Sequence, residues 1–410
     1  MNVSLRRDAE TIARAAIEAV KPDAAVKRAL KNVTLSGRIY LVAVGKAAWQ
    51  MARAAVEALD CSIQEGIVLT KYGHVMGPIP GLRCLEAGHP VPDEGSYRGT
   101  QAVLDMAAHL TEADTVLFLL SGGGSALFEK PLVPPEILEQ VTQTMLASGA
   151  DIVQINTIRK RLSAVKGGRF ALWCAPARVE SILLSDILGD PVDMIASGPA
   201  AADPVTCAQA LETARRYGID ALPGVAECLA QETPKEVPNV HTQIIGSVRQ
   251  LCKAAEETAR QLGYEPIFLT DRMDQEAREA GRNMAEELVR RSKVGQKAAL
   301  IAGGETVVKV TGTGLGGRNQ ELALAAAQVL SAVPNAALIS VGSDGTDGPT
   351  DAAGGYADGD TCRQIREKGL DPRAMLENND AYHALDAANC LIKTGPTGTN
   401  GNDVTIGLIL

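Results

Sequence analysis

The sequence predicts two α/β domains in which strands alternate with helices, and three observations indicate this class. The chain has 410 residues, about two to three times the length of a typical domain. Glycine is abundant, with 40 residues, and aromatic residues make up only 3%. Glycine serves the tight turns between strands and helices, whereas an all-β sandwich is richer in aromatic residues.

In the first half of the chain, apolar runs of strand length are followed by glycine-rich or acidic turns and then by amphipathic segments. The expected strands are 40–45, 115–120 and 181–184. The expected helices are 46–59 and a segment marked by Ile155, Ile158, Leu162 and Val165. Because the strands alternate with helices, they predict a parallel sheet built from βαβ units.

After about residue 200 the sequence becomes proline-punctuated, and a second series of elements follows. Its expected strands are 241–246, 265–270, 298–302, 306–310 and 336–341, and its expected helices are 275–291 and 318–330. We therefore expect one domain over residues 1–235 and a second over residues 236–410.

Charge, hydropathy and cysteine content indicate which partners and which cellular compartment to expect. The net charge is −9, so no basic surface dominates and a general nucleic-acid partner is not expected. No apolar run reaches the length of a membrane span, and the N-terminal segment lacks the apolar core of a secretory signal. The eight cysteines are scattered without a CxxC pair, which is typical of thiols in a reducing compartment. We expect a cytoplasmic protein with neither a nucleic-acid nor a membrane partner.

Polar and glycine-rich turns follow several of the expected strands. They are Gly45-Lys46, Ser121-Gly-Gly-Gly-Ser125, Ser185-Asp186, Gly303-Gly304-Glu305 and the loop from Ser343 to Gly348. In open α/β sheets, ligands bind beyond the carboxyl ends of the strands. Glycine lets backbone amides approach a ligand, lysine neutralises an anion, and aspartate can hold a metal or a proton. Together these turns predict a phosphorylated ligand with Mg²⁺ between the two domains.

Each of these residues also has a plainer interpretation. The Ser121–Ser125 segment can be a tight turn that needs glycine for its backbone, and Lys46 can extend into solvent. Asp186 can cap the next helix. The basic residues at 159, 160, 161 and 166 can form a solvated helix face.

The turn from Gly312 to Gly317 matches the GxGxxG pattern of dinucleotide-binding proteins. The next strand-end acid, Asp344, lies farther along the chain than that pattern usually places it. Arg318 follows the glycines directly and offers a cation that a phosphoryl-transfer site can use. The sequence contains neither a Walker A motif nor the protein kinase motifs.

The motifs in their order along the chain resemble the glycerate 2-kinase family, the class II glycerate kinases with a C-terminal MOFRL domain. They are VGKAA (44–48), SGGGSAL (121–127), NTIRKRLSAVKGGRFA (156–171), LLSDILGDPVDMIASGP (183–199), GGET (303–306), GLGGRNQELAL (314–324), SDGTDGPTDAAG (343–354) and GPTGTNGND (395–403). The resemblance covers essentially the whole chain.

The resemblance implies that ATP, with Mg²⁺, phosphorylates the 2-hydroxyl of D-glycerate to give 2-phosphoglycerate. It further implies a Rossmann-like N-terminal domain with a parallel sheet, a MOFRL-type C-terminal α/β domain and an active-site cleft between them. Lys46 and Arg318 would correspond to the family's catalytic cations. The sequence leaves open whether the protein forms a homo-oligomer.

The remaining roles are a hypothesis built on these expectations. Backbone and hydroxyl groups of Ser121, Gly122, Gly123, Gly124 and Ser125 would cradle the phosphates of ATP. We expect Asp186 as a catalytic carboxylate, although the sequence does not decide which aspartate accepts the hydroxyl proton. The expected Mg²⁺ ligands are Asp190, Asp344, Asp347 and Asp351. Arg159 or Lys166 would bind the carboxylate of glycerate.

Two alternatives remain at this point. An NAD(P)H-dependent hydroxypyruvate reductase of tartrate or glycerate metabolism would bind its pyrophosphate at Gly312 to Gly317. A sensor derived from a kinase would bind a sugar acid without turnover. Oxidation of NADH with hydroxypyruvate would favour the reductase.

Overall fold

The computed structural model describes residues 2–59, 62–185, 187, 189–293, 295, 297–399 and 401–410. The chain divides into two compact units, each described by itself. One unit is Ala25–Ile245, and the other combines Met1–Ala24 with Gly246–Leu410. The expected domains 1–235 and 236–410 differ from these units in two places: the first 24 residues group with the C-terminal part, and residues 236–245 group with the first unit.

The unit Ala25–Ile245 contains a six-stranded sheet in which every neighbouring pair is parallel. Its strands are β1 (Arg38–Val44), β2 (Ile63–Lys71), β3 (Leu82–Ala87), β4 (Asp114–Leu120), β5 (Arg178–Leu184) and β6 (Val240–Ile245). Their order is β3-β2-β1-β4-β5-β6, which is the order of the Rossmann fold. The expected Rossmann-like parallel sheet is confirmed. The expected strand 241–246 is β6 and belongs to this sheet rather than to a second series.

Side chains of this sheet alternate between two apolar cores, as the two-residue period of a strand requires. In β1, Tyr40, Val42 and Val44 pack on the side of α4 (Glu94–Ala107) and α8 (Arg169–Cys174). The intervening Ile39, Leu41 and Ala43 pack on the opposite side. There they meet α2 (Pro22–Leu30) and α3 (Ala48–Ala58). Burial on both faces explains why the strand is apolar without interruption.

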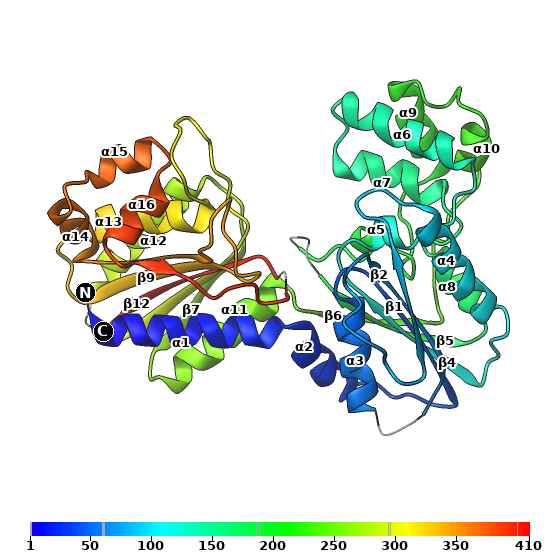
Figure 1. The fold of residues 1–410 in the computed structure, drawn as a ribbon, viewed down its shortest axis with the longest axis horizontal. Helices are drawn as coiled ribbons and strands as arrows, with labels where there is room; N and C mark the ends of the chain where they lie inside the picture. Colours follow the sequence, from blue (N-terminus) through cyan, green and yellow to red (C-terminus); the bar gives the residue numbers. More distant parts are fainter. Residues whose placement is uncertain are drawn as a thin grey trace. The chain divides into compact units, whose positions relative to one another are not determined.

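A group of helices in the chain between β4 and β6 forms a core of its own, separate from the sheet (Figure 1). Its members are α6 (Pro135–Ala147), α7 (Ile152–Arg161), α9 (Cys207–Tyr217) and α10 (Val225–Leu229). The short α5 (Gly124–Leu127) and the 3₁₀ turn η1 (Ile195–Ser197) contact each other, and η1 also contacts α7. The helix expected from Ile155 to Val165 ends at Arg161.

The second unit contains a six-stranded mixed sheet with the order β11-β10-β9-β12-β8-β7. Its strands are β7 (Glu265–Met273), β8 (Ala298–Gly304), β9 (Ala336–Gly342), β10 (Gly354–Asp358), β11 (Leu391–Ile392) and β12 (Asp403–Ile409). Only β7 and β8 pair in parallel; the other pairs are antiparallel. The sequence predicted an α/β domain here, which is confirmed, but it did not predict the direction in which the strands pair. The connection from β9 to β10 carries no helix and cannot make the crossover that a parallel pair needs.

Helices cover this sheet on both faces. α1 (Val3–Val20) packs against α11 (Val248–Gln261) and against β9 and β12 (Figure 1). α12 (Ala277–Ser292) and α13 (Arg318–Leu330) contribute to a core with β8 and β9. The remaining helices are α14 (Thr361–Glu367), α15 (Pro372–Glu377) and α16 (Ala381–Ala387).

Two further observations complete the fold. The segment 306–310, expected as a strand, forms no strand and takes part in an isolated bridge between Val307 and Glu276. Within the described ranges, no helix combines the length and the apolar character needed to cross a bilayer.

Candidate functional site

The strand order places a switch point between β1 and β4, where ligands bind in folds of this kind. The turns after these two strands, Gly45-Lys46 and Ser121 to Ser125, lie against each other. The Lys46 amide donates a hydrogen bond to the Gly122 carbonyl over 2.9 Å. The Ala47 amide donates one to the Ser121 hydroxyl over 3.1 Å. Two turns that are 75 residues apart in the sequence thus form one surface.

Glycine is required where these turns touch. Gly45 has a φ of +121°, and a Cβ there would lie 2.2 Å from Ser121 Oγ. Gly123 has a φ of +86°, and a Cβ there would lie 3.1 Å from both His89 Cδ2 and Lys46 Cγ. Any side chain at these positions would therefore strain the backbone or push the turns apart.

The backbone amides of residues 122–125 make no hydrogen bond to any acceptor in the described part of the chain. Successive free N–H groups of this kind can bind an anion. The Ser121 hydroxyl accepts a hydrogen bond from Ala47 and joins the two turns. Of the five residues that the sequence singled out here, Ser121 supports the turn and the next four supply donors.

Positive charge gathers around these amides. Lys46 is exposed, and Lys71 and His74 lie at and just after the end of β2. His89 follows β3, and its pKa is lowered, first by burial and then by the charges of Lys46, Lys71 and His74. The contribution of Lys46 and Lys71 to this shift shows that the electrostatic potential around His89 is positive. A positive potential attracts an anion.

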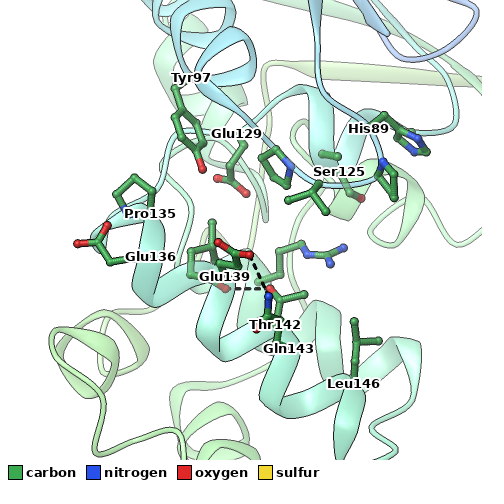
Figure 2. Close-up of a pocket in the computed structure, with 17 residues that line it drawn as sticks. His89, Tyr97, Ser125, Glu129, Pro135, Glu136, Glu139, Thr142, Gln143 and Leu146 are labelled. Carbon is green, nitrogen blue, oxygen red and sulfur yellow. Dashed lines mark hydrogen bonds between the residues drawn. The ribbon is translucent and has the colours of Figure 1, made fainter. Parts of the chain in front are cut away.

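A cavity of about 560 Å³ opens beside the turn 122–125. His89 and Ser125 lie at one side of it, and α6 lies at the facing side with Glu139, Thr142, Gln143 and Leu146 (Figure 2). Arg159 also lines it. No hydrogen bond or ion pair of the Arg159 guanidinium is found among the described residues. Burial lowers the pKa of Arg159, but a guanidinium still stays charged at neutral pH. Arg159 is therefore a cation available to a ligand.

Lys166 is engaged within the fold. It is fully buried, forms an ion pair with Glu129, and donates a hydrogen bond to the Phe128 carbonyl over 3.1 Å. Burial lowers its pKa. Glu129 itself lines the cavity, and its Oε1 atom has no hydrogen-bond partner in the described part of the chain.

The interpretation of the basic residues around α7 as a solvated face was wrong. The Lys160 ammonium lies 2.7 Å from Asp193 Oδ2 and 3.2 Å from Asp203 Oδ1. Arg161 is buried and donates hydrogen bonds to the carbonyls of Val205 and Gln231. These cations hold the segments around residues 193–207 and 231 in place.

Ser125 connects the cavity to an unusual turn. Its hydroxyl lies 3.0 Å from that of Ser197, which donates a hydrogen bond to Asn156 Oδ1 over 2.8 Å. Ala196 and Ser197 have φ values of 49° and 62°, which are strained for residues with a side chain. The Ala196 Cβ also lies 2.6 Å from the position that a Cβ on Gly124 would occupy. Such strain is maintained where surrounding contacts fix it, often at functional sites.

In the other unit, Arg318 is the first residue of α13 and is held by two carboxylates. Its Nε and Nη2 atoms donate to Asp403 over 2.5 and 3.0 Å, and Nη1 lies 3.0 Å from Glu305 Oε1. Burial alone would lower the pKa of Arg318, but the hydrogen bonds and charge of Asp403 raise it. Arg318 is about a third exposed, so part of the charged group faces solvent.

The predicted metal ligands in this unit already have partners. Asp347 is buried and accepts hydrogen bonds from the backbone amides of Asn319 and Gln320 at the start of α13. Asp351 accepts from the Tyr382 hydroxyl and pairs with Lys393. Asp344 accepts from the amide and hydroxyl of Thr346. Over the described ranges, no group of three or more histidine, cysteine or acidic side chains is arranged to hold a metal.

Two predicted carboxylates belong to the loop after β5. Asp186 lies outside the described residues. Asp190 is half-buried with a φ of 53°. No hydrogen bond or ion pair of its carboxylate is found in the part of the chain that the structure describes.

The glycine-rich turn 312–317 packs against the chain before α16. The amides of Thr311 and Gly312 donate to Asn379 Oδ1, and the Gly314 amide donates to the Asn378 carbonyl. A Cβ on Gly317 would lie 2.3 Å from the Asp347 carboxyl carbon. Glycine therefore allows close packing here, and the amides of Gly312 and Gly314 are already engaged within the fold.

Comparison with known proteins identifies the family. Residues 8–230 match a family described as a domain of unknown function, DUF4147, and residues 298–403 match the MOFRL family. A protein from Thermotoga maritima named D-glycerate 2-kinase is 51% identical over 413 residues, which cover 99% of both chains. The chain belongs to the glycerate 2-kinase family.

Other members of the glycerate 2-kinase family match over similar lengths. A glycerate 2-kinase from Pyrococcus horikoshii is 38% identical over 92% of this chain and 89% of its own. A protein from Agrobacterium vitis, provisionally named a hydroxypyruvate reductase, is also 38% identical, over 100% of this chain and 95% of its own. The crystal structure of a glycerate kinase from Thermotoga maritima has a TM-score of 0.95, with 99% of this chain and 100% of that chain covered.

Sequence reasoning for this glycerate 2-kinase family member missed several residues of the site. His89, Glu129, Asn156 and Ser197 all lie at the cavity or the strained turn. The histidine at the end of β3, in Gly88-His89-Pro90, follows the pattern of polar residues after strands and could have been found. Glu129 and Ser197 could not, because only the packing of α5, α7 and η1 brings them to the cavity.

Proposed function

We propose that this protein is an ATP-dependent D-glycerate 2-kinase. The γ-phosphoryl group of ATP would pass to the 2-hydroxyl oxygen of D-glycerate, so that a bond forms from that oxygen to phosphorus and the bond to the ADP oxygen breaks. The hydroxyl proton leaves to a base or to water, and the products are 2-phosphoglycerate and ADP. The observation that carries the proposal is the row of free amides at 122–125 beside Lys46.

In this proposal, the main role of the chain is to bind the two substrates and to place positively charged groups next to their anionic groups. The amides of residues 122–125 hold phosphate oxygens, and Lys46 neutralises charge on the transferring group. Arg318 would supply the second cation, held in orientation by Asp403. Arg159 would bind the carboxylate of glycerate. Lys166, which the sequence offered as an alternative for that carboxylate, supports the site through Glu129 instead.

In this proposal, one of the predicted aspartates binds Mg²⁺ and another accepts the hydroxyl proton. Mg²⁺ bound to nucleotide phosphates needs only one or two protein carboxylates, so a preformed cage of carboxylates is not required. Asp190 fits this role because its carboxylate has no partner among the described residues, whereas Asp344, Asp347 and Asp351 are engaged. The ion would neutralise charge on the phosphates. We keep Asp186 as the candidate proton acceptor and the cytoplasm as the expected compartment.

A paired assay tests the proposal. The purified protein is given D-glycerate, ATP and Mg²⁺ with an enolase-coupled readout specific for 2-phosphoglycerate, and separately hydroxypyruvate with NADH or NADPH. We expect turnover only in the first mixture. Turnover only in the second would show that the protein is a reductase, and turnover in neither would contradict the kinase.

A further inference from the structure

The cavity beside α6 is much larger than a three-carbon acid needs. Its volume of about 560 Å³ lies in the range of pockets that enclose drug-sized ligands. D-Glycerate would fill only a small part of it. All of its lining residues belong to the unit Ala25–Ile245, so the cavity is complete within that unit.

The lining of the cavity changes in character from one side to the other. The side next to the free amides carries His89 and Ser125, with Lys46 adjacent to Gly123. The facing side is α6 with its apolar Leu138 and Leu146. α6 also contributes Glu136 and Glu139, so this side is unfavourable for an anion. The cavity therefore suits a ligand with an anionic end and a neutral end.

A buried hydrogen-bond acceptor, the Glu129 carboxylate, also lines the cavity. Glu129 is 1% exposed, and its carboxylate is directed into the cavity (Figure 2). One of its oxygens is paired with Lys166, and the other, Oε1, accepts no hydrogen bond from the described residues. A buried polar atom without a partner is costly, so a ligand that donates an N–H or O–H group would be favoured there. Phosphate groups carry no such donor at neutral pH, whereas the amino group of a base and the hydroxyls of a ribose do.

We infer that the nucleoside part of ATP binds in this cavity against α6, with its triphosphate leading to the amides of 122–125 and to Lys46. The inference rests on the proposed function, because it takes ATP as the phosphoryl donor. The base and ribose lie along Leu138 and Leu146, and one of their donors reaches Glu129 Oε1. D-Glycerate then binds at Arg159, in a part of the cavity that the nucleoside leaves free.

Two matched tryptophan variants of the full chain test this inference. Gln143 and Gln140 are both exposed residues of α6, but only Gln143 lines the cavity. We expect Gln143→Trp to raise the KM for ATP about tenfold or more by occupying the space, with the KM for D-glycerate changed less than about twofold. Gln140→Trp should change neither constant. Thermal unfolding of both variants confirms that the fold is kept.

Binding measured without turnover provides a second readout. Adding ADP, and separately AMP, should change the tryptophan fluorescence of Gln143→Trp and leave that of Gln140→Trp near the wild-type response. A rise in the KM for D-glycerate alone would overturn the inference, because the α6 side of the cavity would then hold the acid. Unchanged KM values and unchanged fluorescence would also overturn it. If the wild type makes no 2-phosphoglycerate, the proposed function fails, and the fluorescence response still decides whether the cavity binds a nucleotide.

Discussion

Lys46 and Lys166 show how differently two lysines of one site can be used. Lys166 is fully buried and fixed by Glu129, so its charge supports the structure. Lys46 is exposed beside the free amides, and no hydrogen bond or ion pair of its ammonium group is found among the described residues. An ammonium group that is exposed and unpaired among the described residues can stabilise the charge of a transferring phosphoryl group.

We expect Lys46→Ala to lower kcat by about 10²- to 10³-fold, the usual effect of removing one group that stabilises transition-state charge. The free energy of unfolding should change by less than about 0.5 kcal/mol, because the side chain is exposed and pairs with no described residue. Steady-state kinetics and urea unfolding measure the two effects. Lys31→Ala, at another exposed position of the same unit, is the control. A kcat equal to that of the wild type would remove Lys46 from the mechanism.

Arg159 is expected to determine the affinity for the acid. We expect Arg159→Gln to raise the KM for D-glycerate by about 10- to 100-fold, the equivalent of one hydrogen bond to a charged group. Arg215→Gln, at an exposed position of α9, should leave that constant unchanged. Initial rates with D-glycerate and ATP varied in turn separate the two substrates. If the KM for ATP rises instead, Arg159 binds a phosphate and the acid lies elsewhere.

At the scale of elements, the first turn of α13 is hydrogen-bonded to a carboxylate whose pKa is raised. Asp347 accepts hydrogen bonds from the first amides of this helix. Burial raises its pKa to about 6, although the hydrogen bonds from Gln320 and Asn319 oppose the shift. An unfolded aspartate has a lower pKa, so between about pH 4 and pH 6 the folded state binds the proton more strongly. The contribution of Asp347 to the free energy of unfolding therefore falls as the pH rises through this range.

Asp347→Asn should remove that pH dependence. The advantage of the wild type over the variant should decrease by up to about 3 kcal/mol between pH 4 and pH 7, since one pKa unit corresponds to about 1.4 kcal/mol. Urea unfolding at a series of pH values measures the difference. Parallel profiles for the two proteins would show that Asp347 has an ordinary pKa in the folded protein.

The elements that the sequence predicted well are those with strong local patterns. In the first sheet, β2 and β3 were missed. The strands expected at 40–45, 115–120 and 181–184 and the helix expected at 318–330 were recovered, because a continuous apolar run, or a helix start just after glycine, is visible locally. The direction of pairing in the second sheet was not, because β12 inserts antiparallel between β8 and β9 from far along the chain. The burial of Lys160 and Arg161 was missed for the same reason: their partners lie 33 or more residues away.

The candidate site likewise has a part that the sequence predicts and a part that it does not. The turns at Lys46 and at 122–125 were predictable, because parallel strands end at one edge of a sheet and the glycines mark their turns. The roles of the aspartates were not, because whether a carboxylate is free depends on its neighbours. Asp347 and Asp351 follow a strand just as a metal ligand would, yet both are engaged.

At the scale of the whole molecule, the chain does not divide at one point. α1 is the first element in sequence, yet it belongs to the unit that contains Gly246–Leu410. Its Asp8 accepts a hydrogen bond from the Tyr264 hydroxyl over 2.9 Å, and the Val20 carbonyl accepts one from Thr399 over 2.9 Å. Local patterns could not reveal this, because α1 finds its partners more than 200 residues away. The stability of that unit should therefore depend on residues at the start of the chain.

Ile12 of α1 is fully buried, and we expect Ile12→Ala to destabilise this unit by about 2–5 kcal/mol, the usual cost of such a truncation in a core. Hydrogen exchange read by mass spectrometry should become faster in α11, β9 and β12 and stay unchanged in β1 to β6. Val26→Ala, at a fully buried position of α2, is the matched variant and should reverse the pattern. Faster exchange in β1 to β6 of Ile12→Ala would mean that α1 stabilises the first sheet instead, and the division of the chain would have to be redrawn.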